Sequence, residues 1–134
     1  MKTHVVRPIA NLPGLVLLII FSHCQGQSGA QVLTPQAYET RLNSLVNKII
    51  LDVRTSQEYS KGRIKDAILM DYYQRDFNAR LATLDKNKPV FVYCASGVRS
   101  NSTAKKLIRQ GFKEVYDLSG GLDAWVQSGK PIEK

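Results

Sequence analysis

The chain has 134 residues, of which 43% are hydrophobic and 22% are charged, and this length fits one domain with an extension. Its formal net charge is +8 at pH 7. Acidic residues are interleaved with the basic ones, and no basic run reaches the about five or six residues typical of a nucleic-acid-binding arm. The composition therefore argues against a nucleic-acid partner, whereas an anionic small substrate is compatible with it.

The N-terminal residues 1–24 have the layout of a secretory signal peptide. Lys2 and Arg7 make the start positive, residues 15–21 form a short apolar run, and a polar, glycine-containing segment follows at 25–30. The apolar run is far shorter than the about 20 residues of a membrane-spanning helix. We therefore expect an exported protein that is periplasmic or anchored to a membrane as a lipoprotein.

Two endings of this leader are compatible with the sequence. Cys24 resembles the lipidated cysteine of bacterial lipoproteins, although Phe21 and His23 depart from that pattern. The alternative is ordinary cleavage after Ala30, with Ser28 and Ala30 as the small residues. A lipid on Cys24 would attach the protein through acyl chains, and we expect no other contact with a membrane.

Residues 25–33 are predicted to be a linker that leads into a single domain at residues 34–132. Thr34 is a good N-cap before Pro35, and helix and strand patterns alternate from there. The alternation predicts an α/β fold with a mostly parallel central sheet and helices on both faces. The predicted strands are 49–53, 67–70, 90–93 and 115–118. After the first helix, which begins at Pro35, the predicted helices are 56–61, 77–84, 98–110 and a last one from residue 120.

The candidate functional site is the segment from Tyr93 to Ser100. Cys94 directly follows the apolar strand 90–93, and sites in parallel sheets lie outside the carboxyl ends of the strands. The next helix directs its free amides and positive end at the thiol, which favours the thiolate. Gly97 lets the loop bend so that successive amides converge on one anion.

Arg99 gives a second argument for an anion at this loop. A cation in the first turn of a helix is unfavourable by about 0.3–1 kcal/mol. A Cys94 thiolate, a persulfide or an oxyanion substrate would reverse the sign of that interaction. The alternative is that Cys94 is a small buried hydrophobic residue, but the glycine and arginine spacing in a strand–loop–helix context favours a functional role.

The segment Cys94-Ala95-Ser96-Gly97-Val98-Arg99 resembles the six-residue active-site loop of rhodanese-type sulfurtransferases. Further markers of that family occur in order along the chain, and the resemblance covers residues 31–132. These markers are Leu51-Asp52-Val53-Arg54, Glu58-Tyr59, Gly62, Ile64 and the terminal Leu118-Ser119-Gly120-Gly121-Leu122-Asp123-Ala124-Trp125. The resemblance implies a rhodanese-like α/β fold.

The resemblance also implies a covalent reaction cycle. Cys94 would attack a sulfane-sulfur donor such as thiosulfate, hold the sulfur as a persulfide and pass it to a thiophilic acceptor, such as a thiol of a partner protein. Arg99 would attract the anionic donor. The bound sulfur would be stabilised by the loop amides of Ala95, Ser96, Gly97, Val98 and Arg99. An ionised thiol needs no general base, which suits a domain without histidine. We expect no cofactor, and no metal because the ligands of a zinc site are missing.

Asp52, Arg54 and Glu58 are predicted to support the loop and to take no part in the chemistry. An ionised pair at the end of a buried strand can fix the neighbouring loop, and we expect Arg54 to pair with Glu58. Trp125 is expected to pack in the core.

Three positions depart from the family pattern, at Arg63, Asp66 and Leu69. The family usually has Gly-His-Ile where this chain has Gly62-Arg63-Ile64. These positions lie outside the catalytic loop, so they leave the fold unaffected and leave the rim of the pocket and the choice of partner open.

Other functions of a cysteine loop fit less well. A cysteine phosphatase places its arginine after five intervening residues, where this chain has Ser100, and no histidine follows residue 30 to form a protease-type pair with Cys94. The remaining alternative is a non-catalytic rhodanese-like module that binds or regulates a partner at the cell envelope.

Overall fold

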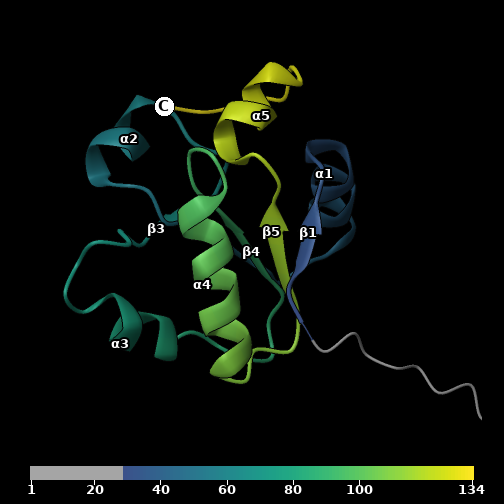
Figure 1. Ribbon diagram of the computed structural model, residues 1–134. Helices are drawn as coiled ribbons and strands as arrows, with labels where there is room; N and C mark the ends of the chain where they lie inside the picture. The colour runs from purple at the N-terminus through teal and green to yellow at the C-terminus, as the bar shows by residue number, and fades with distance from the viewer. Residues whose placement is uncertain (1–28) are drawn as a thin grey trace, which may run out of the picture.

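The structure is a computed structural model that describes residues 29–134 (Figure 1). The predicted leader, with Cys24, lies outside the described residues. Within residues 29–134 no helix has the length and apolar character needed to span a membrane. Ten elements follow one another along the chain: β1 (Gln31–Leu33), α1 (Pro35–Ser44), β2 (Ile49–Asp52), α2 (Ser56–Lys61), β3 (Ile68–Leu69), α3 (Phe77–Ala82), β4 (Val90–Tyr93), α4 (Val98–Arg109), β5 (Val115–Leu118) and α5 (Gly121–Gln127).

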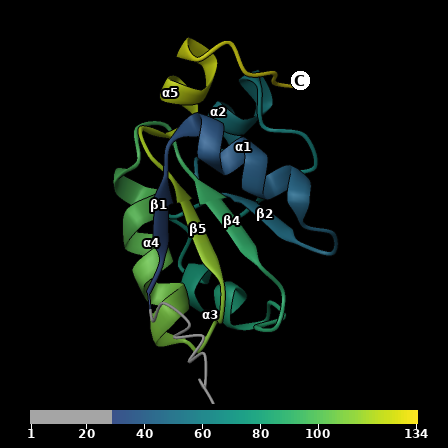
Figure 2. The same ribbon diagram turned by 90° about the vertical axis from the view of Figure 1, so that its right-hand side faces the viewer.

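The five strands form one parallel sheet in the order β1-β5-β4-β2-β3. Helix α1 covers one face of this sheet, and α3 and α4 cover the other (Figure 2). Helices α2 and α5 lie beyond the carboxyl ends of the strands (Figures 1 and 2). The predicted fold class, an α/β sheet flanked by helices on both faces, is confirmed.

Strand β4 is buried on both faces and separates two hydrophobic cores. Val90, Val92 and Cys94 point into the core below α3 and α4. Phe91 and Tyr93 point into the core shared by α1 and α5. This alternation follows from the period of two in a strand, and it places the Cys94 side chain below the first turn of α4.

The segment 25–33, which was predicted to be a linker, contributes a strand that the sequence analysis did not predict. Gln31–Leu33 form β1, which pairs in parallel with β5 at the edge of the sheet. Ser119 N–H also donates to the carbonyl of Leu33 at 2.8 Å. The other predicted elements occur with their ends shifted by at most a few residues.

Two buried tyrosines give a matched test of the core. The Tyr38 hydroxyl has no hydrogen-bond partner, whereas the Tyr93 hydroxyl accepts from Ile64 N–H at 3.1 Å. We expect Tyr38→Phe to keep the free energy of unfolding or raise it by up to about 1 kcal/mol. Tyr93→Phe should lower it by about 1–2 kcal/mol, because a buried N–H loses its acceptor. Urea unfolding measures both, and a clear loss in Tyr38→Phe would contradict the first expectation.

Candidate active site

Cys94 follows β4 directly and is the cysteine of the described residues 29–134. Its Sγ accepts a hydrogen bond from Gly97 N–H at 3.1 Å, and its thiol donates to Ser100 Oγ at 3.5 Å. Only 1% of the residue is exposed. The sulfur therefore lies in a buried polar environment made by the loop and the start of α4.

The start of α4 has no capping side chain. Gly97 is the N-cap, with a φ of +103° that favours glycine, and it carries no side chain to accept from the first amides of the helix. Uncapped amides at a helix N-terminus form a favourable environment for an anion. The predicted convergence of loop amides on one anion is compatible with this geometry, and the Gly97 amide already contacts the sulfur.

The loop is fixed from outside by the start of α5. Leu122 N–H donates to the Cys94 carbonyl at 2.8 Å, and Asp123 N–H donates to the Ala95 carbonyl at 3.0 Å. Gly121 makes this approach possible, because a Cβ there would lie 2.5 Å from the Cys94 carbonyl oxygen and from the carbonyl group of Ala95. The glycine pair that the sequence analysis assigned to the opening of the last helix thus also holds the active-site loop.

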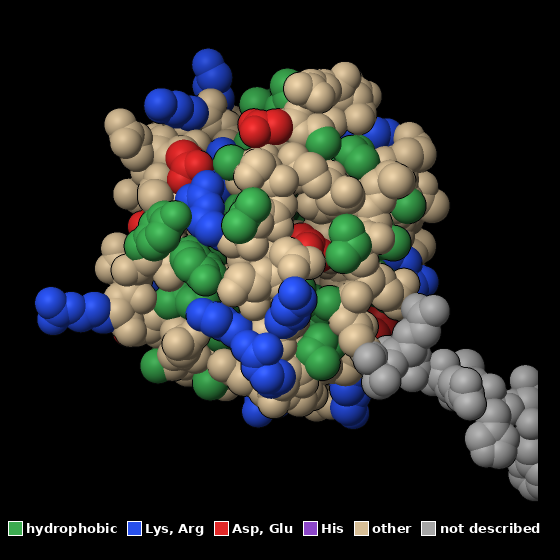
Figure 3. Space-filling model, in the orientation of Figure 1, with side chains coloured by type: hydrophobic (Ala, Val, Ile, Leu, Met, Phe, Trp, Pro, Cys, Tyr) green, Lys and Arg blue, Asp and Glu red, His purple; other side chains and the backbone are tan. Residues whose placement is uncertain are grey.

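Arg99 forms a two-point ion pair with Glu58. Its Nη1 donates to Glu58 Oε2 at 2.9 Å and its Nη2 to Glu58 Oε1 at 2.8 Å. The hydrogen bonds from Arg99 hold the pKa of Glu58 at about 2, and in return the hydrogen bond to Glu58 raises the pKa of Arg99. Acidic and basic side chains adjoin on the surface between α2 and α4 (Figure 3).

The same Glu58 carboxylate also caps α2. Its Oε2 accepts from Thr55 N–H and from Thr55 Oγ1, both at 2.9 Å, in a capping box. The anion that we expected near Arg99 is therefore the carboxylate of Glu58, a group of the protein itself. Because Glu58 already balances the charge of Arg99, the guanidinium group offers a bound sulfur donor little net positive charge.

The predicted pairing of Arg54 with Glu58 is wrong. Arg54 pairs with Asp52 through Nε at 2.9 Å and Nη2 at 2.6 Å, and it reaches only the backbone carbonyl of Glu58. Its Nη2 also donates to the Gly62 carbonyl at 2.7 Å, and its guanidinium lies 5.6 Å from the centre of the Tyr93 ring. The buried pair thus joins the end of β2 to the end of α2, which suits the scaffold role that was predicted for it.

The three positions that depart from the family pattern lie on or near β3. Arg63 lies over the Tyr59 ring at 4.5 Å and pairs with Glu133 at 3.6 Å. Asp66 occupies a left-handed turn position, and Leu69 is in β3 opposite Asp52. None of them makes a hydrogen bond or an ion pair with the cysteine loop in the described part of the chain.

The sequence analysis assigned no role to two buried polar residues near the start of α4, Ser100 and Asp117. Ser100 is fully buried and accepts from the thiol. Asp117, in β5, is 2% exposed, and burial raises its pKa. A carboxylate in the otherwise apolar strand Val115–Leu118 was a signal that could have identified it.

The family model of the rhodanese-like domain matches residues 34–128. The chain belongs to the rhodanese-like family. It is 42% identical over 77 residues to a protein named thiosulfate sulfurtransferase GlpE from Coxiella burnetii, across 58% of this chain and 70% of that one. It is 35% identical over 102 residues to a protein of the same name from Glaesserella parasuis, across 75% of this chain and 91% of that one.

The same fold is found in a rhodanese-related protein from Thermoplasma volcanium. Its crystal structure matches with a TM-score of 0.67 at 23% sequence identity, over 77% of this chain and 97% of that chain. At this identity the likeness concerns the rhodanese-like fold alone.

The contact between Gly121 and the loop predicts that even a methyl side chain at this position destabilises the protein. Gly121→Ala should lower the free energy of unfolding by more than about 2 kcal/mol and speed alkylation of Cys94, because the new methyl group pushes the loop away from α5. Gly129→Ala is the matched control. Gly129 also has a positive φ of 72°, but no atom lies within 4 Å of its Cβ position, so only the backbone strain of about 1 kcal/mol remains. Equal losses in the two variants would argue against tight packing at Gly121.

The Glu58–Arg99 pair predicts a pH-dependent loss of stability. Because the pKa of Glu58 falls from its ordinary 4.5 to about 2 in the folded protein, the pair stabilises the fold above pH 4.5 and is lost as the pH falls towards 2. Since a third of the Glu58 side chain is exposed, we expect Glu58→Gln to cost only about 1–2 kcal/mol at pH 7. Urea unfolding should show that the difference in the free energy of unfolding between the wild type and Glu58→Gln becomes smaller below pH 4.5. Glu133→Gln, which breaks the more exposed pair with Arg63, should cost less at pH 7.

Proposed function

We propose that this protein moves sulfane sulfur from an anionic donor such as thiosulfate to a thiophilic acceptor through a persulfide on Cys94. It is a sulfurtransferase of the rhodanese type. The observation that supports this most is the buried Sγ at the uncapped start of α4, with the Gly97 amide 3.1 Å away. The relatives named thiosulfate sulfurtransferase support the class of reaction.

The chemical cycle has two displacements at sulfur. In the first, the Cys94 thiolate attacks the outer sulfur of thiosulfate, the S–S bond of the donor breaks, and sulfite leaves with the bonding electron pair. The terminal sulfur of the persulfide then carries the negative charge. In the second, an acceptor such as cyanide or a thiolate attacks that sulfur, and the Cys94 thiolate leaves. No proton transfer and no cofactor is needed in either step.

Backbone amides of the loop from Ala95 to Arg99 stabilise the negative charge of the persulfide in this proposal. Arg99 orients the loop through Glu58 and, with its charge balanced, contributes little net attraction for an anion. A longer-range attraction comes from the positive excess of the domain. Lys and Arg side chains gather over α4 (Figure 3), where Lys105, Lys106 and Arg109 are located.

We also propose that the protein is exported and acts in the periplasm or at a membrane through a lipid on Cys24. This proposal is supported only by the sequence pattern of residues 1–24. Mass spectrometry of the mature N-terminus tests it. An unlipidated start at Gln31 would rule out the lipoprotein and support cleavage after Ala30.

The proposed function predicts a one-sulfur adduct on Cys94. After incubation with thiosulfate, the intact mass should increase by one sulfur, and cyanide should then release thiocyanate and restore the original mass. Cys94→Ser should lose the adduct and more than about 1,000-fold of the thiocyanate rate. Ser119→Ala, in the neighbouring loop after β5, is the control and should retain activity.

The alternatives give different results in the same assay. Hydrolysis of an aryl phosphate by the wild-type protein, without a sulfur adduct, would indicate a cysteine phosphatase. Neither an adduct nor any turnover with thiosulfate and cyanide would favour a non-catalytic binding module. Full activity of Cys94→Ser would show that Cys94 is not the nucleophile.

A further inference from the structure

Strand β1 forms one edge of the sheet (Figure 2), and within residues 29–134 no strand pairs with its outer side. Ser119 N–H donates to the Leu33 carbonyl, so the backbone groups of Leu33 face β5. The hydrogen-bonding groups of successive residues in a strand point to opposite sides. The N–H and C=O of Val32 therefore point away from the sheet, and an edge of this kind can pair with a further strand.

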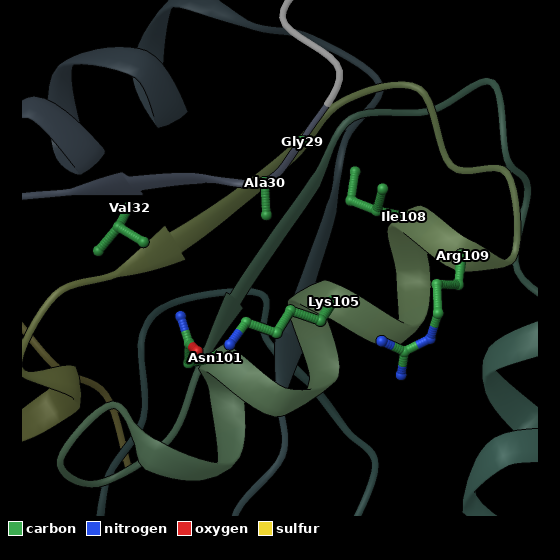
Figure 4. A pocket seen from close by; sticks show the side chains of 7 residues that line it. All are labelled: Gly29, Ala30, Val32, Asn101, Lys105, Ile108 and Arg109. Carbon is green, nitrogen blue, oxygen red and sulfur yellow. The ribbon is translucent and has the colours of Figure 1, made fainter.

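On one side of this edge a hollow of about 400 Å³ lies between β1 and α4. Side chains from the strand and from the helix face each other across it (Figure 4): Ala30, Val32, Asn101, Lys105, Ile108 and Arg109. The side chain of Val32 projects towards α4, yet 55% of the residue is exposed. The helix thus leaves the edge of the strand accessible on this side.

A second hollow of about 390 Å³ lies on the other side of the same strand, between β1 and α1. Its walls include Leu33, Ala37 and Tyr116. Leu33 and Val32 point to opposite faces, because side chains alternate along a strand. A strand added beside β1 would therefore have space for its side chains on both faces. Pockets for alternate side chains are the feature by which a sheet edge selects an extended peptide.

The two hollows differ in charge. On the α4 side, Lys105 and Arg109 are exposed and form no ion pair within residues 29–134. On the α1 side, Arg41 pairs with Glu114 at 3.7 Å and donates to the Tyr116 hydroxyl at 2.9 Å, so its charge is already balanced. The α4 side therefore attracts acidic side chains, and the α1 side accommodates apolar ones. An extended segment in which acidic and apolar residues alternate fits both.

The hollow on the α4 side reaches the cysteine loop. A neighbouring hollow of about 390 Å³ shares Val32 and Asn101 with it and extends to the loop residues 96–98. The 12 residues of α4 span about 18 Å, which is the length of about five extended residues. A segment held along β1 therefore has one end beside the loop that carries Cys94.

We propose that the free edge of β1 is the docking site of the protein that accepts the sulfur. An extended segment of this acceptor, with acidic and apolar residues in alternation, adds to the sheet as a strand between α1 and α4. Its backbone bonds to Val32, its acidic side chains lie against Lys105 and Arg109, and its apolar side chains lie against α1. That the partner is the sulfur acceptor rests on the proposed function, whereas the binding of the segment does not.

The binding is tested with a fluorescein-labelled peptide of eight residues in which glutamate and valine alternate. A peptide with lysine in place of glutamate is the control probe, and fluorescence anisotropy gives both dissociation constants. We expect the lysine peptide to bind at least about ten-fold more weakly, because like charges then meet at Lys105 and Arg109. Equal binding of the two peptides would overturn the proposal.

The place of binding on α4 is tested by removing one charge. Lys105→Gln should raise the dissociation constant of the glutamate peptide about two- to five-fold, as expected for one exposed ion pair. Lys106→Gln is the matched control, because it removes the same charge from a side chain that points to α3, where its Nζ donates to Asn78 at 3.1 Å. Equal weakening in the two variants would indicate attraction by the positive domain as a whole and would contradict a site at the β1 edge.

Val32→Pro tests the pairing of the segment with β1. Proline removes the outward N–H and leaves the hydrogen bonds between β1 and β5, in which that N–H takes no part. We expect the dissociation constant to rise about three- to ten-fold. Val32→Thr keeps the branched shape and the N–H, and it should bind within about two-fold of the wild type. Thermal unfolding verifies the fold of each variant.

Two results would count against an acceptor segment at this edge. One is unchanged binding of the glutamate peptide to Val32→Pro. The other is a dimer of the wild-type protein in sedimentation experiments that Val32→Pro converts to a monomer, since a second copy of the chain would then occupy the edge.

The role of the partner as acceptor has its own measurement. A glutamate peptide with a terminal cysteine should take the sulfur from the persulfide with a lower KM than the lysine peptide with the same cysteine, at a similar kcat, because docking affects binding and not the chemical step. Equal KM values would overturn the acceptor role.

Failure of the docking site and failure of the proposed function give different results. If the glutamate peptide bound at the edge of β1 but thiosulfate left no adduct on Cys94, the proposed function would fail while the docking site held. If thiocyanate formed normally and the peptide did not bind, the docking site would fail while the proposed function held.

Discussion

The site depends on one contact between backbones, in which the first amides of α5 hold the carbonyls of Cys94 and Ala95. Strands β4 and β5 are neighbours in a parallel sheet, so the loops that follow them begin side by side. One loop carries the thiol and the other carries Gly121, whose missing side chain allows the approach. With two carbonyls directed at α5, the loop folds back so that the Gly97 amide meets the sulfur.

Two ion pairs hold α2 in place beside this loop, and each has a second structural task. The Asp52–Arg54 pair also binds the carbonyl at the end of α2. Glu58 holds Arg99 on α4 and at the same time completes the capping box at the start of α2. A shift of α2 would therefore move the guanidinium next to the loop. Local helix capping and the geometry of the active site are thus coupled through a single carboxylate.

The strands and helices could be predicted because their signals are local. Apolar runs, Thr34 before Pro35 and glycines at the ends of helices each decide a conformation within a few residues. Strand β1 could not be predicted, since three residues at a sheet edge owe their conformation to pairing with β5, far along the chain. The same limit explains the error at Arg54. Its sequence neighbours Asp52 and Glu58 are both possible partners, and the choice depends on α4 bringing Arg99 to Glu58.

Stabilising the sulfur anion without limit would not serve a transfer reaction. A thiolate that is strongly stabilised is a weaker nucleophile, although it is also a better leaving group. Cys94 would need both properties, first to attack the donor and then to leave the persulfide. The Gly97 amide at the start of α4 contacts the sulfur at 3.1 Å, and only 1% of Cys94 is exposed, so the sulfur meets one close donor in a buried environment.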